Sequence, residues 1–351
     1  MKILISTPGD ISKNDGTTVR AKRILKVLGT KFDVKLLGSK KFALDIQIIR
    51  RPLRLVNLVT AILRFKFDCV YCSQDRWGFV VFKIFQKIFK YKIIYEAHSI
   101  VSEECRNVKK PMIIVKWAEY FERFIASHSY LVIALSKNTF DFFIKCNENI
   151  ELIPVFLDTK LYKLNEMKRV EIRQRYKISS NIVVGLIGPF NIVFNKHFLT
   201  FLYDNISRFD KRIKFMIIGN CDKRIESERI IYAGYVEDYI DHLSSLDCVL
   251  VPSKIATGGP LNKILESMSL GLAVFTTPAG LVGLDYVTPG KDIFVFEEHE
   301  LVDKMQQLMF EGTLIHQVGK NARHTVEVYY SKEVNTKKLT KLFGVGSYVG
   351  Y

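Results

Sequence analysis

The chain has 351 residues, of which 48% are hydrophobic and 25% charged. This balance predicts a globular protein with a sizeable core, the length favours two domains, and no apolar run is long enough to cross a membrane as a helix. The formal net charge is +16, and residues 1–165 hold 29 Lys and Arg against 15 Asp and Glu, a net of +14. This asymmetry predicts an anionic partner for the N-terminal half.

The first half of the chain alternates apolar strand-like runs with amphipathic helical ones. We predict strands over 2–6, 32–37, 69–72, 92–95 and 130–135, and helices over 17–28, 52–66, 77–90 and 111–126. Such alternation is typical of a parallel, doubly wound sheet.

A polar, basic stretch at 152–169 interrupts the pattern, which then restarts. We predict strands over 182–186, 214–218, 230–232, 248–251 and 272–275, and helices near 197–206, 239–245, 301–310, 315–328 and 333–342. The chain therefore divides into an N-terminal domain (1–160), a linker (161–178), a second domain (179–328), and a C-terminal helix and tail (329–351) that packs back on the first domain.

The most informative segment lies between the apolar runs 248–251 and 272–275. A Gly-Gly-Pro turn at 258–260 opens a helix that ends at Gly271. A glycine-rich turn at a helix start suits a phosphate or diphosphate, and Lys263 and Glu266, three residues apart, share one helix face. Lysine on a diphosphate and carboxylate on hydroxyls would suit a nucleotide sugar. The alternative is an ordinary strand-turn-helix-strand unit with surface Lys and Glu.

Other signals limit the chemistry. Cys69 and Cys72 are spaced like half a zinc site, but in a strand they point to opposite faces, so we expect reduced structural thiols for all six cysteines. No His, Asp and Glu set predicts a metal site, and no G-x-G-x-x-G predicts a nicotinamide dehydrogenase. The N-terminal residues do not follow the pattern of a signal peptide, so we expect a cytoplasmic protein.

Several motifs occur together and in order. They are Asp15-Gly16-Thr17 with Arg20, the strand end 94–98, the stretch 152–158, the turn 234–238, the strand 247–253, the helix 263–271 and the glycine loop 280–284. This set resembles the GT-B glycosyltransferases, and most closely glycosyltransferase family 4, often called group 1. The resemblance covers nearly the whole chain.

The resemblance implies two Rossmann-like, doubly wound domains facing across a cleft, with the acceptor on the N-terminal side and the donor on the C-terminal side. It implies catalytic roles for His98, Lys263 and Glu266, while we expect Glu96 to be a buried or supporting residue. The donor-binding residues it implies are Gly16, Thr17, Gly188, Lys196, Gly258, Gly259, Lys263, Glu266 and Gly280. The expected reaction is retaining, needs no metal or cofactor, and uses a nucleotide sugar such as a UDP- or GDP-sugar to build a cell-surface polysaccharide, a glycolipid or a glycoprotein glycan.

The chain departs from the family pattern in the donor domain. Gly258 stands where the family often has a sugar-binding glutamate, and Pro189 stands where it often has a diphosphate-binding arginine. We therefore expect Lys263 to carry more of the diphosphate charge. Two alternatives remain: a nucleotide-sugar epimerase of GT-B fold, and a degenerate, non-catalytic scaffold that binds sugar nucleotides.

The segment 77–90 combines basic and aromatic residues. Lys83, Lys87 and Lys90 share one predicted helix face, and a second face carries Phe82, Phe85 and Phe89. Arginines of the preceding helix add charge (Arg50, Arg51, Arg54 and Arg64). This pattern predicts peripheral binding to the anionic inner face of a membrane; the alternative is core-packing helices with solvated lysines. No nucleic-acid-binding module is recognisable.

Overall fold

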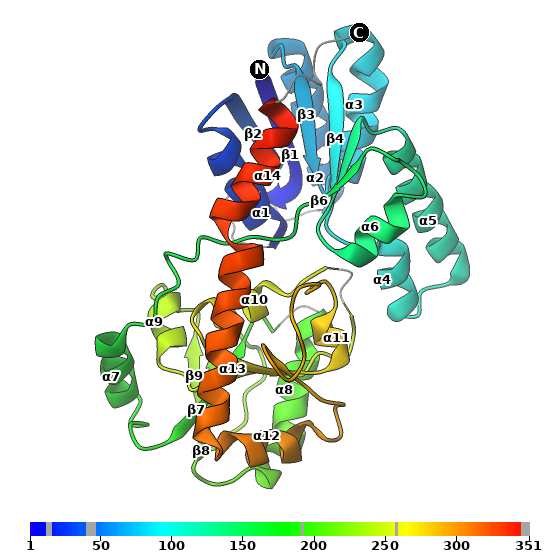
Figure 1. The fold of residues 1–351 in the computed structure, drawn as a ribbon. Coiled ribbons are helices and arrows are strands. Elements are labelled where there is room, and N and C mark those ends of the chain that lie inside the picture. Colours follow the sequence, from blue (N-terminus) through cyan, green and yellow to red (C-terminus); the bar gives the residue numbers. More distant parts are fainter. Residues whose placement is uncertain (12–15, 40–46, 191–192, 257–258, 345–351) are drawn as a thin grey trace. The chain divides into compact units, whose positions relative to one another are not determined.

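The structure is a computed structural model that describes residues 1–11, 16–39, 47–190, 193–256 and 259–344. The chain divides into two compact units. Unit 1 comprises Met1–Val155 together with the chain from Asn335 onward, and unit 2 comprises Phe156–Val334. Each unit holds one six-stranded sheet (Figure 1).

Unit 1 has a fully parallel sheet with the strand order β2-β1-β3-β4-β5-β6. Its strands are β1 (Lys2–Asp10), β2 (Asp33–Ser39), β3 (Cys69–Ser73), β4 (Lys92–Ala97), β5 (Leu131–Ala134) and β6 (Ile150–Leu152). Its helices are α1 (Gly16–Leu28), α2 (Gln47–Arg64), α3 (Arg76–Phe89), α4 (Val101–Asn107), α5 (Met112–Ser127), α6 (Lys137–Phe143) and the part of α14 (Lys332–Gly344) that follows Val334. The strand order reverses between β1 and β3.

Helices cover both faces of the unit 1 sheet because successive strand residues point to opposite sides. On one side Val70 and Cys72 belong to a buried cluster with residues of α2, α3, α5 and α6. On the other side the ring of Tyr71 lies 6.3 Å from that of Phe343 in α14. Every residue of β3 is buried, as expected for a central parallel strand.

Unit 2 has a parallel sheet with the order β12-β11-β10-β7-β8-β9. Its strands are β7 (Ile182–Ile187), β8 (Ile213–Ile218), β9 (Ile230–Gly234), β10 (Cys248–Val251), β11 (Ala273–Thr276) and β12 (Phe294–Val295). Its helices are α7 (Glu166–Arg175), α8 (Val193–Asn205), α9 (Tyr239–Ser244), α10 (Asn262–Ser269), α11 (Pro278–Leu281), α12 (Leu301–Met309) and α13 (Gly312–Thr325). A 3-10 turn (Ile206–Arg208) and a π-helical turn (Val326–Tyr330) complete it. The order reverses between β7 and β10, where doubly wound sheets bind ligands.

The predicted fold class, two doubly wound parallel α/β domains, is confirmed. Residues 161–178, which we expected to be a linker, lie in unit 2 and contain α7. The side chain of Asn165 caps this helix, and Arg173 donates hydrogen bonds to the Ser245 carbonyl (2.9 Å) and to Asp247 (3.2 Å). A polar helix thus packs here through partly buried ion pairs as well as through the buried side chain of Ile172.

Candidate functional site

Lys263 occupies the point of unit 2 where the strand order reverses. It lies in the first turn of α10, which follows β10, and its Nζ donates a hydrogen bond of 2.6 Å to the carbonyl of Ile187, the last residue of β7. The ammonium also lies 4.6 Å from the centre of the Phe198 ring in α8. Among the described residues no carboxylate lies within ion-pair distance of it. Burial lowers the pKa of Lys263 to about 7, against a smaller opposing effect of Glu266.

Glu266 lies one turn further along α10, and two tyrosines orient its carboxylate. Tyr162 donates a hydrogen bond of 3.3 Å to Oε1, and Tyr239 donates one of 2.9 Å to Oε2. Burial and the Glu266 charge raise the pKa of Tyr239 well above its usual value, so Tyr239 stays a donor. Both tyrosines were missed from the sequence, because neither contact is local in the chain.

The chain segments at the carboxyl ends of β10 and β11 contact each other close to the start of α10. Thr276 Oγ1 donates 2.8 Å to the Val251 carbonyl, and Thr277 Oγ1 donates to the Ser253 carbonyl. Gly283 has a φ of +84°, and a Cβ there would lie 2.6 Å from the nitrogen of Pro260. Glycine at 283 therefore permits a close approach of the two loops that no larger residue would allow.

The predicted donor-site glycines have different surroundings. Gly259 lies in the segment that packs against Gly283, and Gly280 is buried in α11, where a Cβ would lie 2.1 Å from Thr276 Oγ1. Gly188 follows β7, and its amide donates a hydrogen bond of 2.8 Å to the Ile218 carbonyl. Gly258 lies outside the described residues. The structure thus brings Gly188, Gly259 and Gly280 to the carboxyl ends of β7, β10 and β11.

The remaining predicted donor residues belong to two helix starts. Lys196 is exposed in the first turn of α8, the helix that follows β7. Gly16 and Thr17 begin α1, the helix that follows β1 in unit 1. Each of them therefore lies near the carboxyl end of the first strand of its unit.

Unit 1 holds a second charged cluster, built around the buried carboxylate of Glu96 at the end of β4. Arg20 of α1 forms an ion pair with Oε2 (2.9 Å), and Tyr71 donates to the same oxygen (2.5 Å). Ser73 donates to Oε1 (2.9 Å). Burial alone would raise the pKa of Glu96, but Arg20, His98 and Tyr71 together lower it well below its usual value. Glu96 is therefore an ionised carboxylate whose charge is compensated locally.

His98 contacts this carboxylate through its ring. Nε2 lies 2.7 Å from Glu96 Oε1 and 3.1 Å from Ser73 Oγ. Because an ionised carboxylate only accepts hydrogen bonds, Nε2 carries the proton and Nδ1 is left for another partner. The backbone N–H of His98 donates to Gln74 Oε1 (2.8 Å), which also holds the residue in place. Glu96, which we expected to be a buried or supporting residue, is thus buried and contacts His98.

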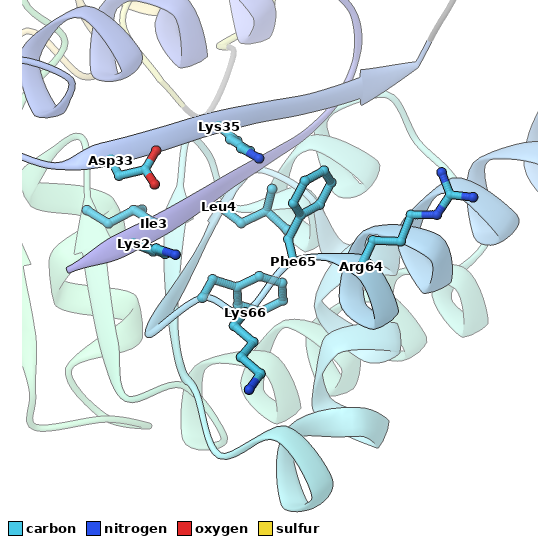
Figure 2. Close-up of a pocket in the computed structure, with 9 residues that line it drawn as sticks. Lys2, Ile3, Leu4, Asp33, Lys35, Arg64, Phe65 and Lys66 are labelled. Atoms are coloured by element: carbon cyan, nitrogen blue, oxygen red, sulfur yellow. The ribbon is translucent and has the colours of Figure 1, made fainter.

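A cavity of about 370 Å³ opens at the amino ends of the strands of the unit 1 sheet, among the first residues of β1 and β2 (Figure 2). Its lining is mainly basic and aromatic: Lys2, Lys35, Arg64, Lys66, Phe65 and Phe67, with Ile3, Leu4 and Asp33. Lys35 Nζ lies 3.6 Å from the centre of the Phe65 ring. Since parallel α/β sheets bind ligands at the carboxyl ends of their strands, this cavity is separate from the predicted site.

The described part of the chain offers neither a metal-ligand cluster nor a membrane-spanning helix. It contains no group of three or more His, Cys, Asp or Glu side chains arranged to hold a metal ion. Within the same residues, no helix combines the length and apolar character needed to cross a membrane. Cys69 and Cys72 are both buried.

Part of unit 2 and the fold of the whole chain are similar to known glycosyltransferases. Residues 181–310 match the family model described as glycosyl transferases group 1. The crystal structure of HepE from Anabaena in complex with UDP and glucose is similar over 98% of this chain and 99% of its own, with 17% identity and a TM-score of 0.76. Sucrose-phosphate synthase from Thermosynechococcus elongatus is similar over 97% and 98%, with 13% identity and a TM-score of 0.81.

A third similar structure is WaaG, a glycosyltransferase involved in lipopolysaccharide biosynthesis. The similarity covers 99% of this chain and 100% of WaaG, with 13% identity and a TM-score of 0.71. No curated protein sequence matches this chain significantly. The chain thus has the GT-B fold of these glycosyltransferases, and residues 181–310 in unit 2 match the group 1 glycosyltransferase model. The narrower assignment to family 4 is compatible with these matches and stays a prediction.

Proposed function

We propose that the protein is a retaining glycosyltransferase that moves a sugar from a nucleotide-diphosphate sugar to a glycan or lipid-linked acceptor, without a metal ion. The observation that carries the proposal is the pair on α10: Lys263 at the end of β7 and Glu266 one turn further. A diphosphate supplies a countercharge for the buried ammonium of Lys263, and the oriented carboxylate of Glu266 accepts hydrogen bonds from ribose hydroxyls.

The similar structures favour a UDP-sugar as donor. HepE has been solved with UDP and with UDP-glucose. WaaG acts in lipopolysaccharide biosynthesis, which favours an acceptor that is part of a cell-surface glycan or glycolipid. We place the reaction on the cytoplasmic side of the membrane, where nucleotide sugars are the expected donors.

In the proposed reaction the acceptor hydroxyl attacks the anomeric carbon from the side of the leaving group. The C–O bond to the diphosphate breaks as the bond to the acceptor oxygen forms, and the departing phosphate oxygen takes the hydroxyl proton. Protonated Lys263 stabilises the charge that develops on the diphosphate. Unit 1 binds the acceptor, and the Nδ1 atom of His98 bonds a hydroxyl of the acceptor or the sugar. Glu96 keeps this imidazole in one tautomer.

The test follows nucleotide release and the sugar product with UDP-, GDP-, ADP- and dTDP-sugars, with and without EDTA. We expect one donor to turn over in EDTA and the product to keep the anomeric configuration. Lys263→Ala should abolish turnover, while Lys304→Ala, which removes an exposed lysine of α12, should not. Isomerisation of a sugar still attached to its nucleotide would identify an epimerase, and donor binding without turnover would identify a scaffold. If no nucleotide sugar binds, the proposal fails.

A further inference from the structure

Two adjacent helices of unit 1 present apolar side chains to solvent. The ring of Phe121 in α5 lies 5.6 Å from that of Trp77 in α3 and is stacked 5.3 Å from that of Trp117. Lys83 Nζ of α3 donates a hydrogen bond of 3.1 Å to the carbonyl of His128, at the end of α5. We call the exposed apolar residues of these helices the α3–α5 face: Trp77, Ile84, Ile88, Phe89, Met112, Ile113, Ile114, Trp117 and Tyr120.

The α3–α5 face is separate from the sides of the helices that form the core. Phe79 and Phe82 of α3 and Ile125 of α5 are fully buried in the unit 1 cluster. On the outer side, Ile113 is 79% exposed, and residues four and seven positions further, Trp117 and Tyr120, continue the same stripe. An apolar surface of this kind, left over after the core is complete, marks an interaction site.

The charges around the face are mainly lysines. Lys87 and Lys90 at the end of α3 and Lys116 on α5 are exposed, as are Lys109 and Lys110 in the segment before α5. On α5 itself the carboxylate of Glu119 forms an ion pair with Arg123 (2.8 Å). The face thus combines apolar residues with a positive rim.

This composition distinguishes between two kinds of partner. Protein–protein interfaces are depleted in lysine. Anionic bilayers, by contrast, attract lysine, and tryptophan and tyrosine accumulate at the level of the lipid headgroups. Lysine at the rim and tryptophan at the centre therefore favour a lipid surface.

We propose that the α3–α5 face binds an anionic lipid bilayer, with Trp77, Trp117 and Tyr120 among the headgroups and the lysines on lipid phosphates. This goes beyond the proposed function, because it depends on the surface of unit 1 and not on sugar transfer. It also revises the surface expected from the sequence. Phe82 is a core residue, whereas α5, which the sequence did not single out, contributes five of the nine residues of the face.

Tryptophan fluorescence tests the insertion directly, because the chain has two tryptophans and both lie on the face. The full-length protein is mixed with phosphatidylcholine vesicles that contain about 30% phosphatidylglycerol, a strongly anionic composition. We expect a blue shift of the emission and quenching by lipids brominated near the headgroup. Trp77→Phe and Trp117→Phe should each retain part of the signal. Binding without a shift or quenching would contradict the proposed insertion.

Vesicle flotation with matched charge variants tests the lysines. The variant Lys87→Gln, Lys90→Gln, Lys116→Gln should lower the partition coefficient by about 100-fold at low salt, or roughly fivefold per lysine. The control Lys337→Gln, Lys338→Gln, Lys341→Gln removes the same charge from exposed positions of α14, on the opposite side of the sheet. We expect a much smaller loss for the control. An equal loss for both triples would show attraction by net charge alone and would overturn the proposal.

A matched aromatic pair tests the apolar part of the face. Tyr120 is 72% exposed on α5, and Tyr235 is 73% exposed in unit 2. Tyr120→Ala should weaken vesicle binding by about tenfold, and Tyr235→Ala should leave it unchanged. Sedimentation without lipid completes the test: if the protein forms a dimer that Tyr120→Ala dissociates, the face binds a second copy of the chain and the proposal is wrong.

Discussion

Replacing Lys263 by methionine should make unit 2 more stable at neutral pH while removing donor binding. Burial lowers the pKa of this lysine from 10.5 to about 7. A shift of this size corresponds to about 5 kcal/mol between the charged and neutral forms. Because the folded pKa is the lower one, the folded state binds fewer protons than the unfolded state between pH 7 and pH 10.5. The free energy of unfolding should therefore rise with pH across this window, by about 1.4 kcal/mol per unit.

At pH 7 most of this cost, about 4 kcal/mol, still opposes folding. Methionine removes the cost and keeps the apolar stem, but it leaves the Ile187 carbonyl without its hydrogen bond, which costs about 2 kcal/mol. We therefore expect the free energy of unfolding of Lys263→Met to exceed that of the wild type by about 2 kcal/mol at pH 7. The advantage over the wild type should shrink as the pH rises towards 10.

Urea unfolding at pH 6, 7, 8 and 9 measures these changes, with hydrogen exchange in β7 and β10 reporting on unit 2. Lys304→Met, at an exposed position of α12, is the control and should alter neither the stability nor its dependence on pH. If Lys263→Met is less stable than the wild type at pH 7 and keeps the same pH slope, then Lys263 is not a desolvated cation and the argument is refuted.

Calorimetry gives an independent readout, because an anion beside Lys263 should restore its proton. UDP binding should take up about half a proton at pH 7 and nearly one at pH 8, as shown by the dependence of the binding enthalpy on the buffer. Above pH 7 the affinity should fall as the pH rises, by up to tenfold per unit. Binding that takes up no proton at pH 8 would place the diphosphate elsewhere.

Three further predictions follow from individual contacts. Glu96→Gln removes the carboxylate that forms an ion pair with the buried Arg20, so we expect urea unfolding to show a loss of about 3–5 kcal/mol. Because the folded pKa of Glu96 is lowered, its contribution is present above the unfolded pKa of about 4.3 and is lost as the pH falls further, so the difference between the proteins should shrink in acid. Gly283→Ala forces a side chain onto Pro260 at a φ of +84° and should lower Tm, with a cost of about 2 kcal/mol or more. Tyr239→Phe removes one of the donors that orient the carboxylate on α10 and should weaken UDP binding by about tenfold, with little change in Tm.

The parts of the fold that the sequence predicted well are those where local signals coincide. The apolar run of β10 is bounded by Pro252, and Gly271, which has a φ of +78°, lies just after the C-terminal end of α10. These signals act within a few residues, so their positions could be read from the chain. By contrast, β12 has two residues, too few for any periodicity, and was missed.

The candidate site was only partly predictable, for a related reason. Lys263 and Glu266 share a helix turn, so their common face follows from the spacing alone. The side chain of Tyr162 lies 104 residues away from Glu266 in the chain, and only the packing of unit 2 brings them together. The exposed face of α5 was missed because an amphipathic pattern shows which residues can share a side, but not which side the sheet covers.

Two of the buried charged residues, Glu96 and Lys263, differ in a way that bears on function. Glu96 has an arginine, a tyrosine, a serine and a histidine around its carboxylate, so its charge is stabilised within unit 1 before any ligand binds. Lys263 has one carbonyl and one aromatic ring, and its pKa is close to neutrality. A compensated charge can orient a neighbour such as His98, but it gains little from a new ion. An uncompensated one gains the full interaction with a diphosphate. This difference is the physical reason to assign donor binding to α10 and a positioning role to Glu96.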